Sequence, residues 1–238
     1  MSRWLPADNA FATLPLIWLV FTLGAFQFGT WLNRLFGGST LVSPVLIAMI
    51  LVICALRTFD LDYSVYLNEG GGLIAALLGP ATVALAVPLY NNARHVRRAL
   101  LPLACAVAVG GITAAGSAFG LAWILGAPTA VLNSIALKSV TAPIAIGIAE
   151  EIGGVASLAA AFAVLTGVAG TMLSGWLLHR AGVRSWAAQG LAAGVTAHGQ
   201  GTARMLAINE TAGAFASVGM GLNALFTAIW LPALLTLL

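Results

Sequence analysis

Two short segments of this sequence place polar and cationic side chains inside long apolar stretches. The first reads LKSVTAP over 137–143 and holds the only lysine of the chain, and the second reads AHGQGTAR over 197–204. An ammonium attracts anions as a point charge, whereas a guanidinium binds carboxylates bidentately. An imidazole changes its charge near neutral pH. Together these groups predict binding of a small anion, most simply a carboxylate, with a proton as a coupling ion.

The candidate binding residues are polar side chains or glycines within apolar runs: Thr82, Asn133, Lys138, Ser139, Thr141, His198, Gly199, Gln200, Gly201, Thr202 and Arg204. Gly79, Pro80 and Pro143 mark expected helix breaks, because proline removes a backbone donor and glycine weakens a helix. A broken helix exposes backbone amides that attract anions. His198, Glu150 and Glu151 are the candidates for proton coupling.

Each of these candidates also has a purely structural explanation. Lys138 fits a lysine that reaches from a helix end to the membrane surface. Arg204 fits a buried cation paired with a carbonyl or an acid, and Pro80 fits a tolerated kink. Glu150 and Glu151 fit solvated charges at the end of a helix. Ionisable residues inside a membrane are nevertheless functional candidates by default.

The sequence lacks the patterns of an enzyme or a cofactor-binding protein. Ser139 and His198 have no acidic neighbour to complete a triad, and no Gly-x-Ser-x-Gly occurs. The three histidines are isolated, and Cys54 and Cys105 lie in apolar runs, where we expect them to be buried. No nucleotide-binding glycine pattern precedes a strand. We therefore expect no enzymatic activity, no metal and no cofactor.

The elements that must position these residues are membrane-spanning helices. The chain is 61% apolar and 7% charged, against roughly 25% charged residues in soluble domains. A spanning helix needs roughly 20 mostly apolar residues. The uncharged runs predict an all-α polytopic membrane protein with about nine spans, at 11–33, 41–56, 70–90, 99–118, 119–132, 133–151, 155–178, 188–208 and 212–237.

The loop charges predict the orientation of these spans. Short loops rich in arginine, at 91–98 and 179–185, favour the cytoplasmic side, and Arg34 adds a third cytoplasmic position. The acidic loop 57–69 fits the opposite side. We therefore expect a multi-pass protein of the bacterial inner membrane, with the N-terminus outside and the C-terminus in the cytoplasm.

A shift of 120 residues lays the first four spans over the last four, with Gly79 and Thr82 on Gly199 and Thr202. The paired spans run in opposite directions. This pattern predicts an inverted repeat, with residues 1–118 and 133–238 as its two halves and 119–132 as a linking helix. Transporters built in this way bind substrate near the midplane, where broken helices meet.

The stretches LGPATVALAVPLY over 78–90, LKSVTAPIAIGIAEEIGG over 137–154 and GLAAGVTAHGQGTARMLAINE over 190–210 resemble the LrgB/CidB family of bacterial membrane proteins, which includes YohK. The resemblance covers nearly the whole chain. The usual proline before the lysine of that family is Leu137 here.

This resemblance implies two functions that remain open. The family was named for antiholin-like or holin-like modulation of murein hydrolase activity and cell lysis, beside a small LrgA/CidA-type partner. It is also related to the plastidial glycolate/glycerate translocator and is similar to the cation/proton antiporters and bile-acid symporters, with two broken, crossing helices and an elevator-type mechanism. The cationic residues favour secondary transport of small monocarboxylates, such as glycolate, glycerate, pyruvate or acetate. A homodimer is expected because the first two spans carry no polar site.

Overall fold

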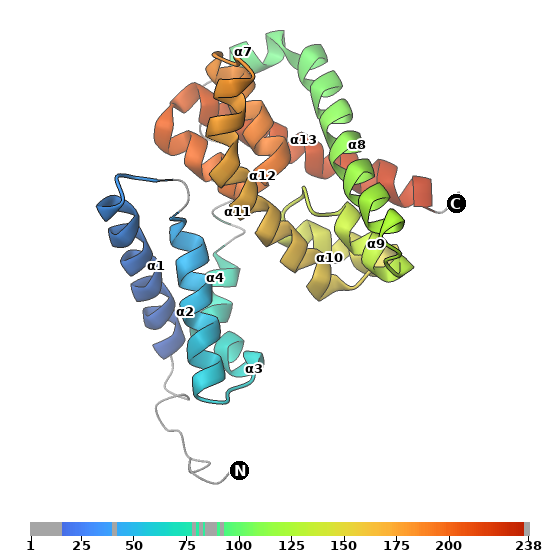
Figure 1. Ribbon diagram of the computed structural model, residues 1–238. Helices are drawn as coiled ribbons and strands as arrows, with labels where there is room; N and C mark the ends of the chain where they lie inside the picture. The colour runs from blue at the N-terminus through green and yellow to red at the C-terminus, as the bar shows by residue number, and fades with distance from the viewer. Residues whose placement is uncertain are drawn as a thin grey trace. The chain divides into compact units, whose positions relative to one another are not determined.

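The computed structural model describes residues 16–39, 42–77, 80, 83, 90 and 93–235, and every regular element within them is a helix (Figure 1). The chain divides into two compact units, residues 1–84 and 85–238. The predicted all-helical architecture is therefore confirmed for the described residues. Gly79 and Thr82 lie outside them.

In the first unit, two antiparallel helices are joined by a tight turn. The Asn33 amide donates to the carbonyl oxygens of Ser39 and Val42, both at 2.7 Å, and this closes the turn. A β-carbon at Gly29 would lie 2.9 Å from the carbonyl oxygen of Pro44, so glycine permits the close approach of the two helices. The elements are α1 (Ile17–Leu35), α2 (Pro44–Thr58), α3 (Tyr63–Tyr66), η1 (Leu67–Gly71) and α4 (Gly72–Ala76).

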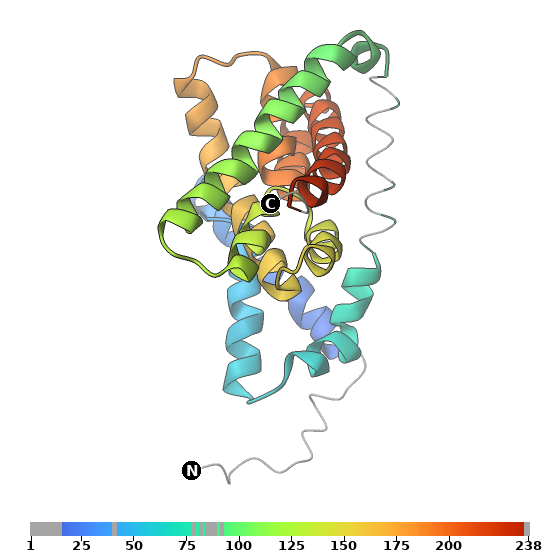
Figure 2. The same cartoon turned by 90° about the vertical axis from the view of Figure 1, so that its right-hand side faces the viewer.

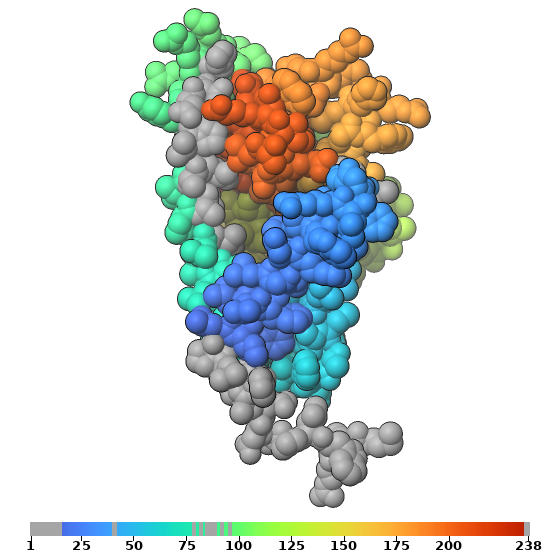
Figure 3. Space-filling view, turned by 90° about the vertical axis from the view of Figure 1, so that its left-hand side faces the viewer, coloured from blue at the N-terminus to red at the C-terminus, as the bar shows by residue number. Residues whose placement is uncertain are grey.

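The surface of the first unit is largely apolar. Phe26 and Trp31 are exposed on α1, whose atoms form the dark blue surface in Figure 3. Large apolar side chains on the outside of a soluble domain are unfavourable, whereas lipid accepts them. The exposed apolar side chains of α1 are therefore compatible with lipid around the first unit.

The second unit contains the longest helices. Three of them, α8, α11 and α13, have 25, 25 and 26 residues and are apolar enough to cross a membrane. At 1.5 Å per residue each is about 38 Å long, more than the ~30 Å hydrocarbon core. The chain is thus a membrane protein. The elements are α7 (Ala93–Arg98), α8 (Leu100–Ile124), α9 (Thr129–Ala136), α10 (Ala142–Glu151), α11 (Ala156–Arg180), α12 (Trp186–Ile208) and α13 (Glu210–Leu235).

Helices α12 and α13 lie side by side (Figure 2) and pack against each other through glycine and alanine, with the first half of α12 running parallel to α13. A β-carbon at Gly190 or Gly194 would collide with the backbone of Ala212 or Ala216. From the other side, a β-carbon at Gly219 would lie 2.9 Å from the carbonyl oxygen of Leu191. Small residues let helix backbones approach closely within a membrane. This packing makes α12 and α13 the densest pair of the unit.

Helices α9 and α10 fold back on each other. The Asn133 amide of α9 donates to the carbonyl oxygen of Ile152 at 2.6 Å, and the Val155 N–H donates to Ser134 Oγ at 2.8 Å. These bonds join the middle of α9 to the residues that follow α10. Residues 129–151 therefore form a helical hairpin, with its tip at 137–141.

The helix bounds around this hairpin differ from the predicted ones. Helix α8 continues to Ile124, through the predicted boundary between 118 and 119. The predicted linking helix over 119–132 is divided between the end of α8 and the start of α9, and the predicted span over 133–151 is interrupted at 137–141. Hydropathy does not register the turn at 125–128 because its residues are apolar or small, and the few polar residues at 137–141 are averaged with the apolar residues on both sides. The inverted repeat and its nine spans remain a prediction.

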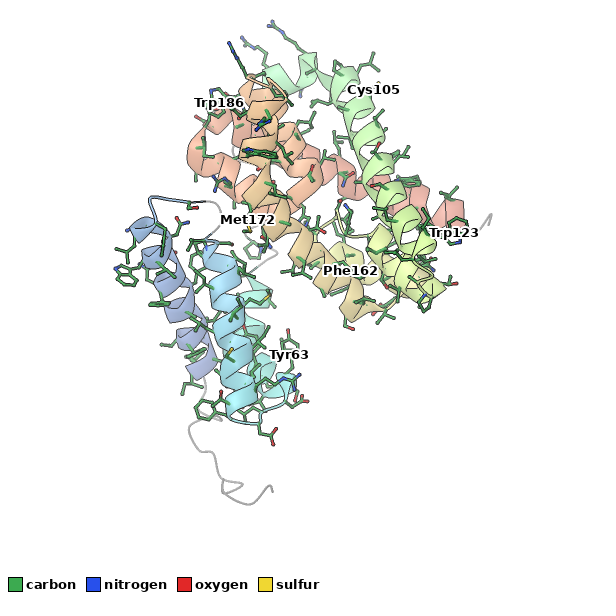
Figure 4. The ribbon with its side chains drawn as sticks, in the orientation of Figure 1. Tyr63, Cys105, Trp123, Phe162, Met172 and Trp186 are labelled. Carbon is green, nitrogen blue, oxygen red and sulfur yellow. The ribbon has the colours of Figure 1, made fainter. Side chains whose placement is uncertain are left out.

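The two cysteines also differ from expectation. Cys54 and Cys105 are both exposed free thiols rather than buried ones. Figure 4 shows Cys105 near the start of α8 and the exposed Trp123 near its end. Position in an apolar run does not distinguish a core-facing from a lipid-facing residue, because both surroundings are apolar.

Candidate functional site

The tip of the α9–α10 hairpin carries the lysine. Helix α9 ends at Ala136 and α10 begins at Ala142. Between them, Lys138 Nζ donates to Ser139 Oγ at 3.1 Å. Lys138 is partly buried and Ser139 is buried. The tip thus holds an ammonium and a hydroxyl in contact, inside the unit.

Pro143 has a different role from the predicted one. It occupies the first turn of α10, where Thr141 is the residue before the helix and makes no capping hydrogen bond with its side chain. A proline in the first turn removes no helical hydrogen bond and starts a helix well. The break is therefore made by residues 137–141, and Pro143 begins the helix that follows.

Helix α12 is broken at His198. Its backbone has φ 40° and ψ −122°, within a helix that otherwise runs from Trp186 to Ile208. A positive φ is unfavourable for a residue with a β-carbon, and such strain persists only where the surroundings hold it. The break thus lies directly before Gly199 and Gly201, two of the predicted binding residues.

Two side chains hold this break against α11. His198 Nε2 lies 2.9 Å from the carbonyl oxygen of Ala163, and Gln200 Nε2 donates to that of Val164 at 3.3 Å. A carbonyl oxygen only accepts, so His198 Nε2 carries a proton. Gly167 leaves room for both side chains, since a β-carbon there would lie 2.8 Å from His198 Cε1. Helix α11 is therefore the support of the α12 break.

One amide joins the two breaks. Asn223, on α13, donates from Nδ2 to the carbonyl oxygen of Ser139 at 2.8 Å and to that of Val195 at 3.4 Å. Its side chain is 1% exposed. The sequence-based search missed Asn223, although an amide inside the apolar run 211–238 is a detectable signal. A polar group in a membrane needs a hydrogen-bond partner, so an amide in an apolar run is a functional candidate in the same way as a charge.

The two breaks meet at Asn223, and Lys138 and His198 each lie within three residues of a carbonyl group that this amide binds. In the described part of the chain no carboxylate pairs with Lys138, and no cluster of three metal-ligating side chains occurs. The site thus combines a cation, hydroxyl and amide groups, and one titratable ring, which is the donor set that a small anion requires.

The remaining predicted residues of α12 lie beyond its break. Thr202 is fully buried, with its hydroxyl 3.9 Å from Met220 Sδ. Gly201 packs against the α12 backbone, and Gly199 has open space around its α-carbon. Arg204 is partly buried and has no hydrogen-bond or ion-pair partner among the described residues. Arg204 is thus a free cation six residues past the break.

Some predicted residues are not brought to the tip. Asn133 closes the base of the hairpin instead. Glu150 and Glu151 are exposed at the far end of α10, about 15 Å from the tip at 1.5 Å per residue. Pro80 is exposed in the first unit. A meeting of the two predicted broken helices, and proton coupling by the glutamates, remain predictions.

In comparisons with known proteins, the LrgB-like family matches residues 22–237. The holin-like protein CidB of Staphylococcus epidermidis is 32% identical over 83% of this chain and 86% of its own length. The antiholin-like protein LrgB of Bacillus cereus is 31% identical over 92% of this chain and 94% of its own. The uncharacterised protein YxaC of Bacillus subtilis is 35% identical, over 93% and 95%. No solved structure matches the chain.

Proposed function

The chain belongs to the LrgB-like family, and we propose that it acts in the holin-like or antiholin-like class named for its relatives, by passing a small monocarboxylate across the membrane. The relatives' names support the first part of this proposal. The buried site supports the second. The two parts are compatible, because carboxylate flux alters membrane energetics and thereby lysis.

The observation that carries the proposal is an uncompensated lysine at a helix break. Lys138 contacts Ser139 Oγ, and no carboxylate of the described residues neutralises it. A partly buried cation without a carboxylate partner is costly, and a bound anion lowers that cost. Simple pores that open a hole need no such group. The partly buried, unpaired Arg204 on α12 adds a second cation for the passage of the anion.

Proton coupling belongs to the same proposal. The bond to Ala163 fixes the proton of His198 on Nε2, so Nδ1 is the ring atom that gains or loses a proton. A proton bound beside Lys138 adds a second positive charge and strengthens anion binding. A symporter that binds proton and anion together has this property.

The loop charges and the family support a proposal for the location, orientation and partners of the protein. The protein lies in the bacterial inner membrane with its N-terminus outside, assembles as a homodimer and acts beside a small LrgA/CidA-type partner. It carries out no chemical reaction on its substrate and needs no cofactor.

Uptake of labelled glycolate, glycerate, pyruvate and acetate into proteoliposomes tests the transport part. We expect saturable uptake of at least one of them, lowered at least tenfold by Lys138→Met, which keeps most of the length of the side chain without its charge. Arg184→Ala is the matched control, because Arg184 is exposed in the loop after α11, and we expect it to stay within twofold. No saturable flux, or equal flux in both variants, contradicts carboxylate transport.

Autolysis and murein hydrolase assays test the holin-like part separately. Cells are compared with the wild-type chain, Lys138→Met and Arg204→Ala. If both variants lose the lysis phenotype, lysis depends on the passage of the anion. A phenotype that both variants keep favours a holin-like or antiholin-like role exerted through a partner or an oligomeric pore, without the buried cations.

A further inference from the structure

The α9–α10 hairpin is too short to cross a membrane with either arm. Helix α9 has 8 residues and α10 has 10. These lengths correspond to about 12 Å and 15 Å, each near half of the ~30 Å hydrocarbon core. The bonds of Asn133 and Ser134 hold the middle of α9 against the residues that follow α10. A chain that goes half-way and returns enters and leaves the membrane on the same side.

The contacts of the tip place it at mid-depth. Asn223 lies thirteen residues after the start of α13 and twelve before its end. It contacts Ser139 in the tip and Val195 in the middle of α12. Because α13 is long enough to span the membrane, the middle of α13 corresponds to the membrane midplane. The tip, with Lys138 and Ser139, is therefore at that depth.

We propose that residues 129–151 form a re-entrant hairpin, and that Asn223 is the positioning residue that holds its tip against the α12 break at the membrane midplane. The amide satisfies two carbonyl groups left free by the breaks, one on each element. Non-helical backbone at this depth is tolerated only when protein or water satisfies it. This topology also agrees with the orientation predicted from the loop charges. That orientation requires the chain to leave one face of the membrane and return to it between residues 119 and 152.

A second contact makes Asn223 unusually sensitive to its surroundings. A β-carbon at Gly111, on α8, would lie 2.6 Å from Asn223 Oδ1. Helix α8 thus fixes the amide from behind, and Gly111→Ala displaces the amide without removing it. Gly116, on the same helix, has nothing within 4 Å of a β-carbon. These two glycines provide a perturbation of Asn223 and its matched control.

Cysteine labelling tests the topology. In a background with Cys54 and Cys105 replaced by alanine, single cysteines are placed at Thr129, Ser157 and Ser185, all exposed. A membrane-impermeant maleimide is applied to spheroplasts and to inverted vesicles. We expect labelling of positions 129 and 157 from one face and of position 185 from the other. Labelling of 129 and 157 from opposite faces overturns the re-entrant hairpin.

Labelling of Thr141→Cys tests the role of Asn223. We expect slow labelling at this tip position in the otherwise unchanged chain. Loss of two intramembrane hydrogen bonds raises the rate about fivefold to tenfold. Asn223→Leu and Gly111→Ala are both expected to do so, whereas Gly116→Ala is not. The rate at position 129 is expected to stay constant in all of them, since the base is held by Asn133 and Ser134.

Two outcomes overturn the role of Asn223: an unchanged tip rate in Gly111→Ala, or equal acceleration at the tip and at position 129, which indicates general loosening. Gly111→Ala decides the question even where Asn223→Leu fails to fold. The measurement uses no substrate. Failure of carboxylate transport therefore leaves this inference standing, and failure of this inference leaves transport standing.

Discussion

Replacing Gly167 by alanine is expected to release the α12 break from α11. The added β-carbon would lie 2.8 Å from His198 Cε1 and 3.0 Å from Gln200 Cδ, so both side chains must move. They then lose their bonds to the carbonyl groups of Ala163 and Val164. The two lost bonds cost about 0.6 kcal/mol each in a membrane. Overpacking costs about 1–3 kcal/mol, and alanine returns about 0.5–1 kcal/mol of helix propensity. The net destabilisation is about 1–4 kcal/mol.

Gly175→Ala is the matched control for this prediction. Gly175 lies on the same helix, and a β-carbon there meets nothing within 4 Å. The propensity gain therefore stands alone, and we expect stabilisation of about 0.5–1 kcal/mol. The free energy of unfolding is measured for both variants in mixed micelles, with denaturant titration followed by circular dichroism. If the free energy of unfolding changes equally in the two variants, or rises in Gly167→Ala, α11 does not stabilise the break in α12.

Two further variants test the base of the hairpin and a loop cap. Ser134→Ala leaves the Val155 N–H without its acceptor, and we expect a loss of about 1–3 kcal/mol in the same unfolding assay. Ser117→Ala, whose hydroxyl bonds only within α8 and is exposed, is expected to be neutral; equal losses contradict the role of Ser134. Hydrogen bonds from the side chain and backbone N–H of Ser64 hold the pKa of the Asp62 carboxyl below its ordinary value of 3.8. Asp62 therefore stabilises the fold above about pH 4, and this contribution is lost as the pH falls through the lowered pKa. The melting temperatures of wild type and Asp62→Ala are expected to differ at pH 6 and to converge in strong acid; a constant difference contradicts this.

The sequence predicts the polar centre better than the path of the chain to it. Lys138 and His198 were found because charges in apolar runs are conspicuous, and the structure brings these two together. The fold-back of α9 was not found, because it depends on side-chain bonds from Asn133 and Ser134 to residues about twenty positions away. Hydropathy reports burial from water and contains no information on such pairings.

Asn223 shows a second reason why the sequence alone did not predict the whole site. An amide carries no charge, so it does not interrupt an uncharged run, yet its bond to Ser139 is the longest-range hydrogen bond of the site in sequence separation. Its partners are backbone carbonyl groups, which leave no trace in residue identity. The position of the α12 break is similar: two glycines indicated weakness, while the strained residue is the neighbouring His198.

The glycine contacts between α12 and α13 also limit how the protein can move. Because backbone meets backbone at Gly190, Gly194 and Gly219, neither helix can slide or rotate past the other without a collision. The part of α12 before the break therefore moves together with α13 as one block. Any movement within the second unit must therefore occur at the borders of this block, where it meets α8, α11 and the hairpin tip. Asn223 lies on that border, so one amide joins the block to its neighbour and sets how readily they part.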